Sequence, residues 1–439
     1  MTAKRIISFL LASLMLVLCS CANTPPDQSM GGWDTDPNPI GGSQSSLLLS
    51  ELSLIEEKGT EASSEFSEAI GRSAFNYFSA SIEDGKAKEN ILISPLSIYI
   101  ALAMTACGAE GDTLSQMQSV LGDLSIRDAA HYIYSLCEDI TYNRNITLNL
   151  ANSIWVNDND NMINVNEAFL DVTKEYFSAD TFMAEFDEST LKDINGWIEE
   201  NTDGMIKEML DKIPEDAVMY LINALVFEAD WKDTYETTQI REGQFTSYDG
   251  KKITTELMYG SEDYYLKDDS AQGFIKPYAD SRYAFAALLP DEDTDVYEYA
   301  KSLTGERFAN ILDAKEKAIV QTAMPQFSYE YDDSLVNELQ ELGMTDAFDS
   351  ARADLSGLGT SPQGNIYISR ILHKTFIEVS PKGTKAGAAT IVEAVCESAM
   401  EIIDAKRYQV YLDRPFVYAI VDLETGTPLF LGILASLEE

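Results

Sequence analysis

Residues 378–398 read EVSPKGTKAGAATIVEAVCES, and this stretch decides how the rest of the chain is interpreted. At a strand period of two, one face carries only small or apolar side chains: Thr384, Ala386, Ala388, Thr390, Val392 and Ala394. The alternate face carries both charges found within residues 383–395, Lys385 and Glu393. Composition leaves two interpretations open: a β-hairpin with an alanine-rich second strand, or an exposed loop that becomes a strand when it slides between existing ones.

A separate run with strand character, residues 366–379, comes directly before it. One continuous strand of about 30 residues would far exceed the usual length of strands in globular proteins. Residues 380–383, Ser-Pro-Lys-Gly, have the composition of a turn. The sequence therefore predicts a strand, a turn and then the segment with the two unlike faces.

The N-terminus has the pattern of an export signal. Lys4 and Arg5 form its basic region, and residues 6–18 form an apolar region too short to span a membrane. Residues 18–21, Leu-Cys-Ser-Cys, resemble the bacterial lipoprotein processing box, which implies cleavage before Cys21 and acylation of its thiol. We expect a lipoprotein signal peptide at 1–20 and a flexible tether at 21–46, which is rich in Pro, Gly, Ser and Asp. The expected location is a bacterial outer membrane, on its periplasmic or cell-surface face.

Composition excludes several classes of protein. Of five cysteines, loss of Cys19 and acylation of Cys21 leave three, an odd number that rules out a complete disulfide framework, and their spacing matches no zinc pattern. Lys and Arg number 31 against 73 Asp and Glu, which gives a formal net charge of −42. This charge argues against nucleic acid and anionic lipid as partners. The negative charge mildly favours cationic proteins as partners. A solvated acidic surface that aids solubility explains the charge equally well. No cofactor and no metal site are expected.

The remainder of the chain, residues 47–439, is expected to form the folded domain. Helical periodicity dominates its first third, and one helix follows Ser94-Pro95, where proline is allowed in the first turn. Apolar runs of strand length dominate the rest, and residues 415–421 and 429–434 flank the turn of a C-terminal hairpin. This order predicts a mixed α+β domain.

No catalytic motif is present in the sequence. Nucleophilic hydrolysis by serine or cysteine needs a general base, nearly always histidine, and the chain has two histidines. His131 falls on a predicted helix and His373 within the 366–379 run, and we interpret both as hydrogen-bonded structural residues. No metalloprotease, P-loop or dinucleotide motif occurs. We therefore expect that the protein is not an enzyme, although a glycosidase that uses only carboxylates would leave no clearer trace.

Eight short motifs occur along the chain. They are NILISPLS at 90–97, NSIW at 152–155, LINALVFEADW at 221–231, MPQF at 324–327, LGM at 342–344, ADLSGL at 353–358, HK at 373–374 and DRPF at 413–416. Their order and spacing resemble those of the serpin family over about residues 60–437. The resemblance implies a single α+β domain with three β-sheets, about nine helices and an exposed reactive loop.

In that family the stretch quoted first corresponds to the hinge and reactive loop, which a target protease attacks as a substrate. The resemblance implies an acyl-enzyme, followed by insertion of the cleaved loop as a new central strand that traps the protease before deacylation. The implied hinge residues are Gly383, Thr384, Ala386, Gly387, Ala388, Ala389 and Thr390. We accordingly expect a suicide-type inhibitor of serine endopeptidases, with cysteine endopeptidases as further targets.

Counted from Gly383 as in the family, the scissile bond falls between Glu397 and Ser398. Glu397 would then fill the primary pocket of a glutamate-preferring protease. The segment that follows is longer than is common, so the bond can also lie elsewhere between Val395 and Met400. Cleavage elsewhere in that range would suit elastase-like or broad-specificity enzymes.

The resemblance also assigns residues around the strands that must part. The implied shutter residues are Ser94, Ser97, Asn152, Asn223 and His373, and Trp231 marks the breach, where insertion begins. Buried but paired polar groups would let these strands open by exchanging hydrogen bonds. The chain departs from the family at Pro381 and Gln326, which replace an acidic and a basic residue, so we expect the insertion point to be less firmly held.

Two functions compete on this basis. The first is a monomeric, lipid-anchored inhibitor whose partners are a target endopeptidase, held in a covalent complex, and the lipid bilayer, bound through acylated Cys21. The second is a non-inhibitory protein of the same fold that acts in binding or surface adhesion. Cleavage of the loop distinguishes them, because only insertion would change the unfolding temperature.

Overall fold

The computed structural model of the chain describes residues 64–82, 89–142, 146–158, 162–215, 217–384 and 406–437. All of them belong to one structural unit, Ser43–Glu439. The α-helices in these ranges are α3 (Ser64–Ala80), α4 (Pro95–Ala106), α5 (Gly111–Val120), α6 (Ile126–Tyr142), α7 (Glu167–Phe177), α8 (Glu188–Asn201), α9 (Val296–Ser302), α10 (Gly305–Asp313) and α11 (Val336–Glu341). Two 3-10 helices, η1 (Thr237–Gln239) and η2 (Asp346–Phe348), are also present.

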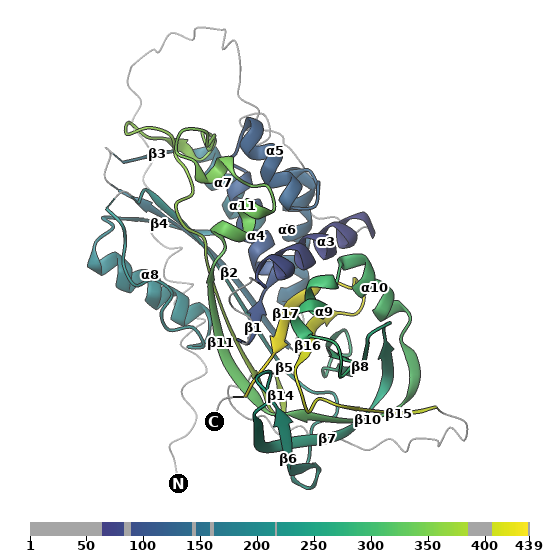
Figure 1. Ribbon diagram of the computed structural model, residues 1–439. Helices are drawn as coiled ribbons and strands as arrows, with labels where there is room; N and C mark the ends of the chain where they lie inside the picture. Colours follow the sequence, from purple (N-terminus) through teal and green to yellow (C-terminus); the bar gives the residue numbers. More distant parts are fainter. Residues whose placement is uncertain are drawn as a thin grey trace, which may run out of the picture. The chain divides into compact units, whose positions relative to one another are not determined.

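The strands of the same ranges form three sheets (Figure 1). A six-stranded sheet has the order β11 (Phe327–Ser334), β13 (Leu372–Val379), β14 (Gly383–Thr384), β5 (Met219–Asp230), β2 (Ile146–Asn157) and β4 (Asp180–Ala184). A nine-stranded sheet has the order β1 (Ile91–Ile93), β17 (Pro428–Leu434), β16 (Phe416–Asp422), β9 (Tyr283–Pro290), β8 (Ala271–Pro277), β7 (Lys252–Lys267), β10 (Glu316–Pro325) and β15 (Arg407–Tyr411), with β6 (Ile240–Thr246) paired to β7. The third sheet pairs β12 (Gly359–Thr360) with β3 (Asn164–Val165).

Strand alternation explains why the six-stranded sheet is covered on both faces. In β2, Ile154 and Val156 belong to the main core, whereas Trp155 between them packs in a separate cluster with Ile194 and Ile198 of α8. Successive side chains of a strand point to opposite faces. Helix α8 therefore covers one face of the sheet, and α4 and α6 cover the other (Figure 1).

Helix α4 begins where the sequence predicts. The hydroxyl of Ser94 accepts a hydrogen bond from the Ser97 N–H and so caps the helix, and Pro95 occupies the first turn. Eleven of its twelve residues are buried. A helix that is apolar on every side lies inside a core, and α4 lies behind the centre of the six-stranded sheet.

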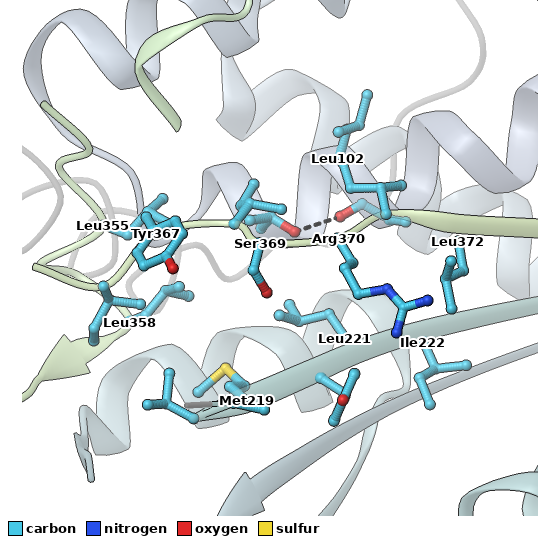
Figure 2. A pocket seen from close by; sticks show the side chains of 18 of the residues that line it. Leu102, Met219, Leu221, Ile222, Leu355, Leu358, Tyr367, Ser369, Arg370 and Leu372 are labelled. Carbon is cyan, nitrogen blue, oxygen red and sulfur yellow. Dashed lines mark hydrogen bonds between the residues drawn. The ribbon is translucent and has the colours of Figure 1, made fainter. Parts of the chain in front are cut away.

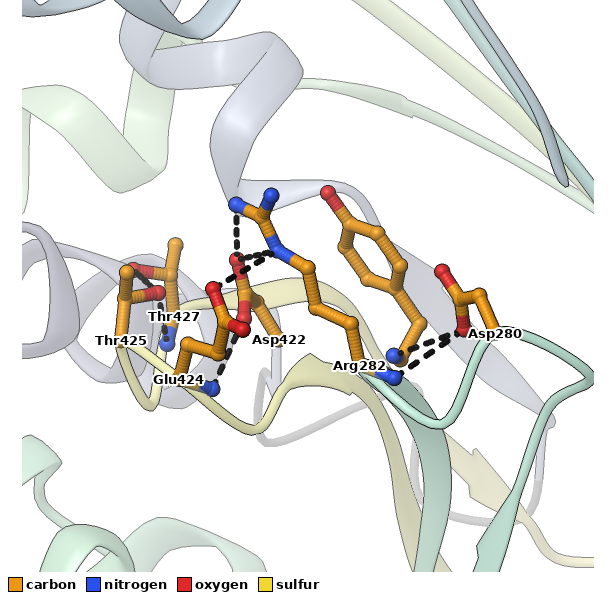
Figure 3. A network of polar contacts seen from close by, with 7 residues as sticks. Asp280, Arg282, Asp422, Glu424, Thr425 and Thr427 are labelled. Atoms are coloured by element: carbon orange, nitrogen blue, oxygen red, sulfur yellow. Dashed lines mark hydrogen bonds and ion pairs between the residues drawn. The ribbon is translucent and has the colours of Figure 1, made fainter. Parts of the chain in front are cut away.

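The C-terminal hairpin of β16 and β17 is buried along both strands. Figure 3 shows how side chains fix its turn. Arg282, just before β9, donates from Nε and Nη2 to Oδ2 of Asp422 at 3.0 and 2.8 Å, and Oδ1 of Asp422 accepts the N–H of Glu424 at 2.9 Å. The hairpin is thereby joined to the neighbouring strand at its turn as well as along its length.

One strand is shorter than the sequence predicts. The run expected from residue 366 becomes a strand only at Leu372. Its partner β11 ends at Ser334, which pairs with Leu372, and the chain then turns into α11. Residues 366–371 are therefore left without a strand opposite them in the described part of the chain.

Candidate functional site

The six-stranded sheet is divided at its centre. β13 pairs with β11 and β14, and β5 pairs with β2 and β14. Because β14 has only two residues, β13 and β5 share no other backbone pairing in the described part of the sheet. Both strands run antiparallel to β14, so they run parallel to each other with a slot between them.

A cavity of about 270 Å³ occupies the end of this slot away from β14 (Figure 2). Residues 217–223 form one wall, residues 361–374 form the other, and α4 contributes Leu102. Most of the side chains shown there are apolar, among them Leu221 and Ile222 on one wall and Leu372 on the other. The slot thus leaves space between two unpaired strand edges, the geometry that an added strand requires.

Gly383 and Thr384 occupy the first positions of the slot. They pair with β5, where Thr384 lies opposite Ala229, and with Val379 of β13. A Cβ added to Gly383 would lie 2.1 Å from the carbonyl oxygen of Ala229, so only glycine permits this close approach. Thr384 is 2% exposed, and its Oγ1 lies 2.6 Å from the hydroxyl of Tyr278. Thr384 therefore points into the core, as the alternation in the sequence predicts for the face with small side chains.

The turn before β14 is held by the segment that follows β5. Three successive carbonyls of the turn accept hydrogen bonds: Lys382 O from Trp231 N–H at 2.8 Å, Ser380 O from Trp231 Nε1–H at 2.9 Å and Pro381 O from Tyr235 N–H at 2.9 Å. Trp231 is 2% exposed. It lies where β14 begins, the place that the family resemblance implies for it.

Pro381 and Gln326 each take part in a hydrogen bond. The side chain of Gln326 donates to Glu256 Oε2 at 3.1 Å, and the carbonyl of Pro381 is one of the three that hold the turn. Trp231 also stacks on Tyr278, with ring centroids 4.6 Å apart and planes 11° apart. The insertion point is therefore held by backbone hydrogen bonds and ring stacking, and the expectation that it is held less firmly than in the family stays a prediction.

The five polar residues implied as the shutter form one chain of hydrogen bonds across the slot. On β13, Nε2 of His373 accepts the N–H of Ser94 at 3.0 Å, and Ser94 in turn accepts from Ser97 at 3.3 Å. The hydroxyl of Ser97 donates to Oδ1 of Asn223 on β5. Nδ2 of Asn223 donates to Oδ1 of Asn152 on β2 at 2.7 Å, and Asn152 donates to a carbonyl at the end of α7. The first turn of α4 therefore links the two strands that border the slot.

His373 is buried, and burial lowers the pKa of its ring to about 4 against a weaker opposing effect of the Asp333 carboxylate. Nε2 accepts a hydrogen bond from the backbone N–H of Ser94, so the ring is neutral and carries its own proton on Nδ1. Protonation of Nε2 would place its N–H donor against the N–H donor of Ser94. These contacts agree with the hydrogen-bonded structural role predicted for His373. His131 differs: its ring packs against Tyr176 with ring centroids 5.3 Å apart, and its Nε2 has no hydrogen-bond partner in the described structure.

Several predicted site residues lie outside the described residues: Ala386, Gly387, Ala388, Ala389, Thr390, Glu397, Ser398 and Cys21. The hinge beyond Thr384, the scissile bond and the lipid attachment site therefore stay predictions. Within the described ranges, no group of three or more His, Cys, Asp or Glu residues is placed to hold a metal ion. No helix in those ranges is long and apolar enough to cross a membrane.

Sequence reasoning missed two residues of the site: Tyr278, which contacts the hinge, and Thr375, which lies near His373 on β13. Tyr278, at the end of β8, provides both the ring under Trp231 and the hydroxyl at Thr384, and burial raises the pKa of that hydroxyl. Thr375 lies two residues after His373 on the same face of β13, and its hydroxyl donates to the carbonyl of Leu92 at 2.7 Å. The period of two in β13 could have identified Thr375, whereas Tyr278 required the register of a second sheet.

The candidate site is thus a slot at the centre of a sheet, a two-residue strand at one end of that slot and a polar network that links the strands beside it. Comparison with known proteins gives the family. A family model described as Serpin (serine protease inhibitor) matches residues 68–437. Human Serpin B8 is 31% identical over 382 residues, which cover 84% of this chain and 98% of Serpin B8.

Solved structures agree with this match. The thermophilic serpin tengpin in its native state superimposes with a TM-score of 0.80 at 41% identity, and the match covers 88% of this chain and 98% of tengpin. Human thyroxine-binding globulin complexed with thyroxine gives a TM-score of 0.75 at 22% identity over 86% of this chain and all of the other, which shows a shared fold alone. The chain belongs to the serpin family, whose members are generally protease inhibitors and not enzymes. The predicted α+β fold with three sheets and about nine helices is confirmed.

Proposed function

We propose that the protein is a suicide-type inhibitor of serine endopeptidases, and of cysteine endopeptidases as further targets. The protease attacks the loop after Thr384 and forms an acyl-enzyme, and the cleaved loop then enters the slot between β13 and β5. Insertion draws the bound protease away from the loop's starting position and distorts its catalytic site before the ester is hydrolysed. The reactive bond is placed between Glu397 and Ser398, within the wider range Val395 to Met400.

The observation that carries this proposal is the position of β14. Its two residues are already paired with both borders of the slot, so each further residue of the loop can add to a strand that has begun. A new strand extends most easily from residues that are already paired, because ordering its first residues has the largest entropy cost. The cavity at the far end of the slot leaves room for the strand to extend.

The proposal extends to the location of the protein. We place residues 1–20 as a lipoprotein signal peptide, residues 21–46 as a tether and residues 47–439 as the serpin domain, with Cys21 acylated at a bacterial outer membrane. Support comes from the basic and apolar regions of the N-terminus and from the Leu-Cys-Ser-Cys sequence at 18–21. The inhibitor would then act as a monomer near the membrane surface.

The function is tested by mixing the protein with a glutamate-specific endopeptidase, pancreatic elastase and subtilisin. We expect a covalent complex that survives boiling in detergent with at least one of them, and mass spectrometry of the released C-terminal fragment identifies the bond. Thr384→Arg should convert the inhibitor into a substrate, because it forces a charge into a buried position, and should raise the stoichiometry of inhibition by at least about tenfold.

Lys382→Arg is the matched control, since Lys382 is exposed and lies just before the slot. It should leave the stoichiometry unchanged. Equal inhibition by Thr384→Arg and the native sequence would exclude loop insertion as the mechanism. Cleavage of the loop without any covalent complex would favour the non-inhibitory function in binding or surface adhesion, consistent with a fold that thyroxine-binding globulin also has.

A further inference from the structure

Two charged side chains lie in the core beside the insertion point. Lys276 of β8 and Glu262 of β7 form an ion pair with Nζ and Oε1 2.9 Å apart, and their side chains are only 3% and 7% exposed. Nζ also donates to the carbonyl oxygen of Asp233 at 3.1 Å. Buried charges are tolerated when they are paired and hydrogen-bonded, as here, so this pair is a built part of the site and not a solvated surface contact.

The ammonium group of Lys276 faces two aromatic rings. Nζ lies 4.4 Å from the ring centroid of Tyr235 and 5.3 Å from that of Trp231. A cation over an aromatic face is attracted by the negative charge of the ring surface, and the attraction is strongest where water is excluded. Trp231 also stacks on Tyr278, with ring centroids 4.6 Å apart. The ring position of Trp231 is therefore set by a buried cation and a second ring together.

These two aromatic residues are the ones that hold the hinge turn. Trp231 and Tyr235 donate all three hydrogen bonds to the carbonyls of residues 380–382. Asp233, whose carbonyl accepts from Lys276, lies between them in the chain. Lys276 thus contacts the segment 231–235 at three residues, Trp231, Asp233 and Tyr235.

We propose that the Lys276–Glu262 ion pair positions the segment 231–235 and thereby keeps Gly383 and Thr384 seated in the slot. In this way it determines how often the cleaved loop inserts before the acyl-enzyme is hydrolysed. Its effect on inhibition rests on the proposed function, whereas its effect on the seating of the hinge does not.

The test uses the double variant Lys276→Met/Glu262→Leu in the full chain. Replacing both partners avoids the unpaired buried charge that either single variant would leave, so the fold is retained. The matched control is Arg307→Met/Asp268→Leu, which removes another partly buried pair whose cation lies over a tyrosine ring, 5.4 Å from the centroid of Tyr299. That pair joins α10 to the residue that follows β7, and in the described residues it makes no hydrogen bond with the turn at 380–382.

Amide hydrogen exchange measures the seating of the hinge directly. In the double variant, we expect the N–H groups of Trp231 and Tyr235 to exchange at least about tenfold faster, while the buried hairpin β16–β17 keeps its native rates. The control variant should match the native protein at Trp231 and Tyr235. Unchanged exchange at these two amides in the double variant would overturn the proposal, as would an equal increase throughout the hairpin, which would indicate only a loss of overall stability.

Kinetics with the protease that forms a covalent complex provide the second measurement. The double variant should raise the stoichiometry of inhibition several-fold and leave the rate constant for the initial encounter unchanged, because the pair lies inside the protein. An unchanged stoichiometry would overturn its role in insertion. If the native protein forms no covalent complex with any protease, the proposed function fails, and the exchange experiment still decides whether the pair seats the hinge.

Discussion

His373 shows how one buried side chain makes the centre of the sheet sensitive to pH. Its ring accepts a hydrogen bond from Ser94, and burial lowers its pKa to about 4, from an ordinary value near 6.5. The folded protein thus favours the neutral ring, whereas the unfolded chain binds a proton already at about pH 6.5. The stability supplied by the neutral ring is complete above that pH and is lost as the pH falls toward 4.

We predict that the free energy of unfolding falls by up to about 3 kcal/mol between pH 7 and pH 4 through His373 alone, since each pKa unit corresponds to about 1.4 kcal/mol. His373→Gln keeps a hydrogen-bond acceptor for Ser94 and does not titrate, so it should lack this part of the pH dependence. Chemical unfolding of both proteins at several pH values measures the difference. Curves that remain parallel from pH 7 to pH 4 would show that His373 contributes nothing.

The two-residue strand β14 joins elements that are far apart in the sequence, and part of this arrangement could be predicted. Alternation along β13 places His373 and Thr375 on the buried face, and the small residues after Gly383 indicate a strand that could enter a sheet. The slot itself could not be predicted, because it depends on how β14 pairs with both β13 and β5 and separates the two strands. Lys276 and Glu262 were missed for a similar reason, since only the register of β7 and β8 brings their side chains together.

The C-terminal hairpin offers a test of how one ion pair supports an element. Asp422 is 4% exposed and depends on Arg282 for its charge partner. Arg282→Met should lower the free energy of unfolding by about 2 kcal/mol or more, because it leaves a buried carboxylate unpaired. Adding Asp422→Asn removes that charge and keeps an oxygen to accept the N–H of Glu424, so the double variant should recover much of the loss. Denaturant unfolding of the single and double variants measures this, and additive losses would contradict it.

At the scale of the whole molecule, the slot means that the described strands have not reached their maximum of backbone pairing. Within the described residues, the edges of β13 and β5 face each other without hydrogen bonds except at β14. Each backbone hydrogen bond contributes on the order of 1 kcal/mol net. A loop strand that filled the slot would pair with both edges at once, and this gain in free energy is what could drive the displacement of a bound protease.

The gain can be measured without any knowledge of the natural target. A protease that cuts the loop without being trapped should raise the midpoint of thermal unfolding by on the order of 10 °C, because about ten added hydrogen bonds shift the unfolding temperature of a chain of this size by that much. Cleaved Thr384→Arg is the control, since a charge at this buried position blocks the first step of insertion, and it should unfold at the temperature of the intact variant. If the cleaved native sequence also unfolds at its original temperature, the loop stays outside the sheet, and the slot between β13 and β5 serves another purpose than trapping a protease.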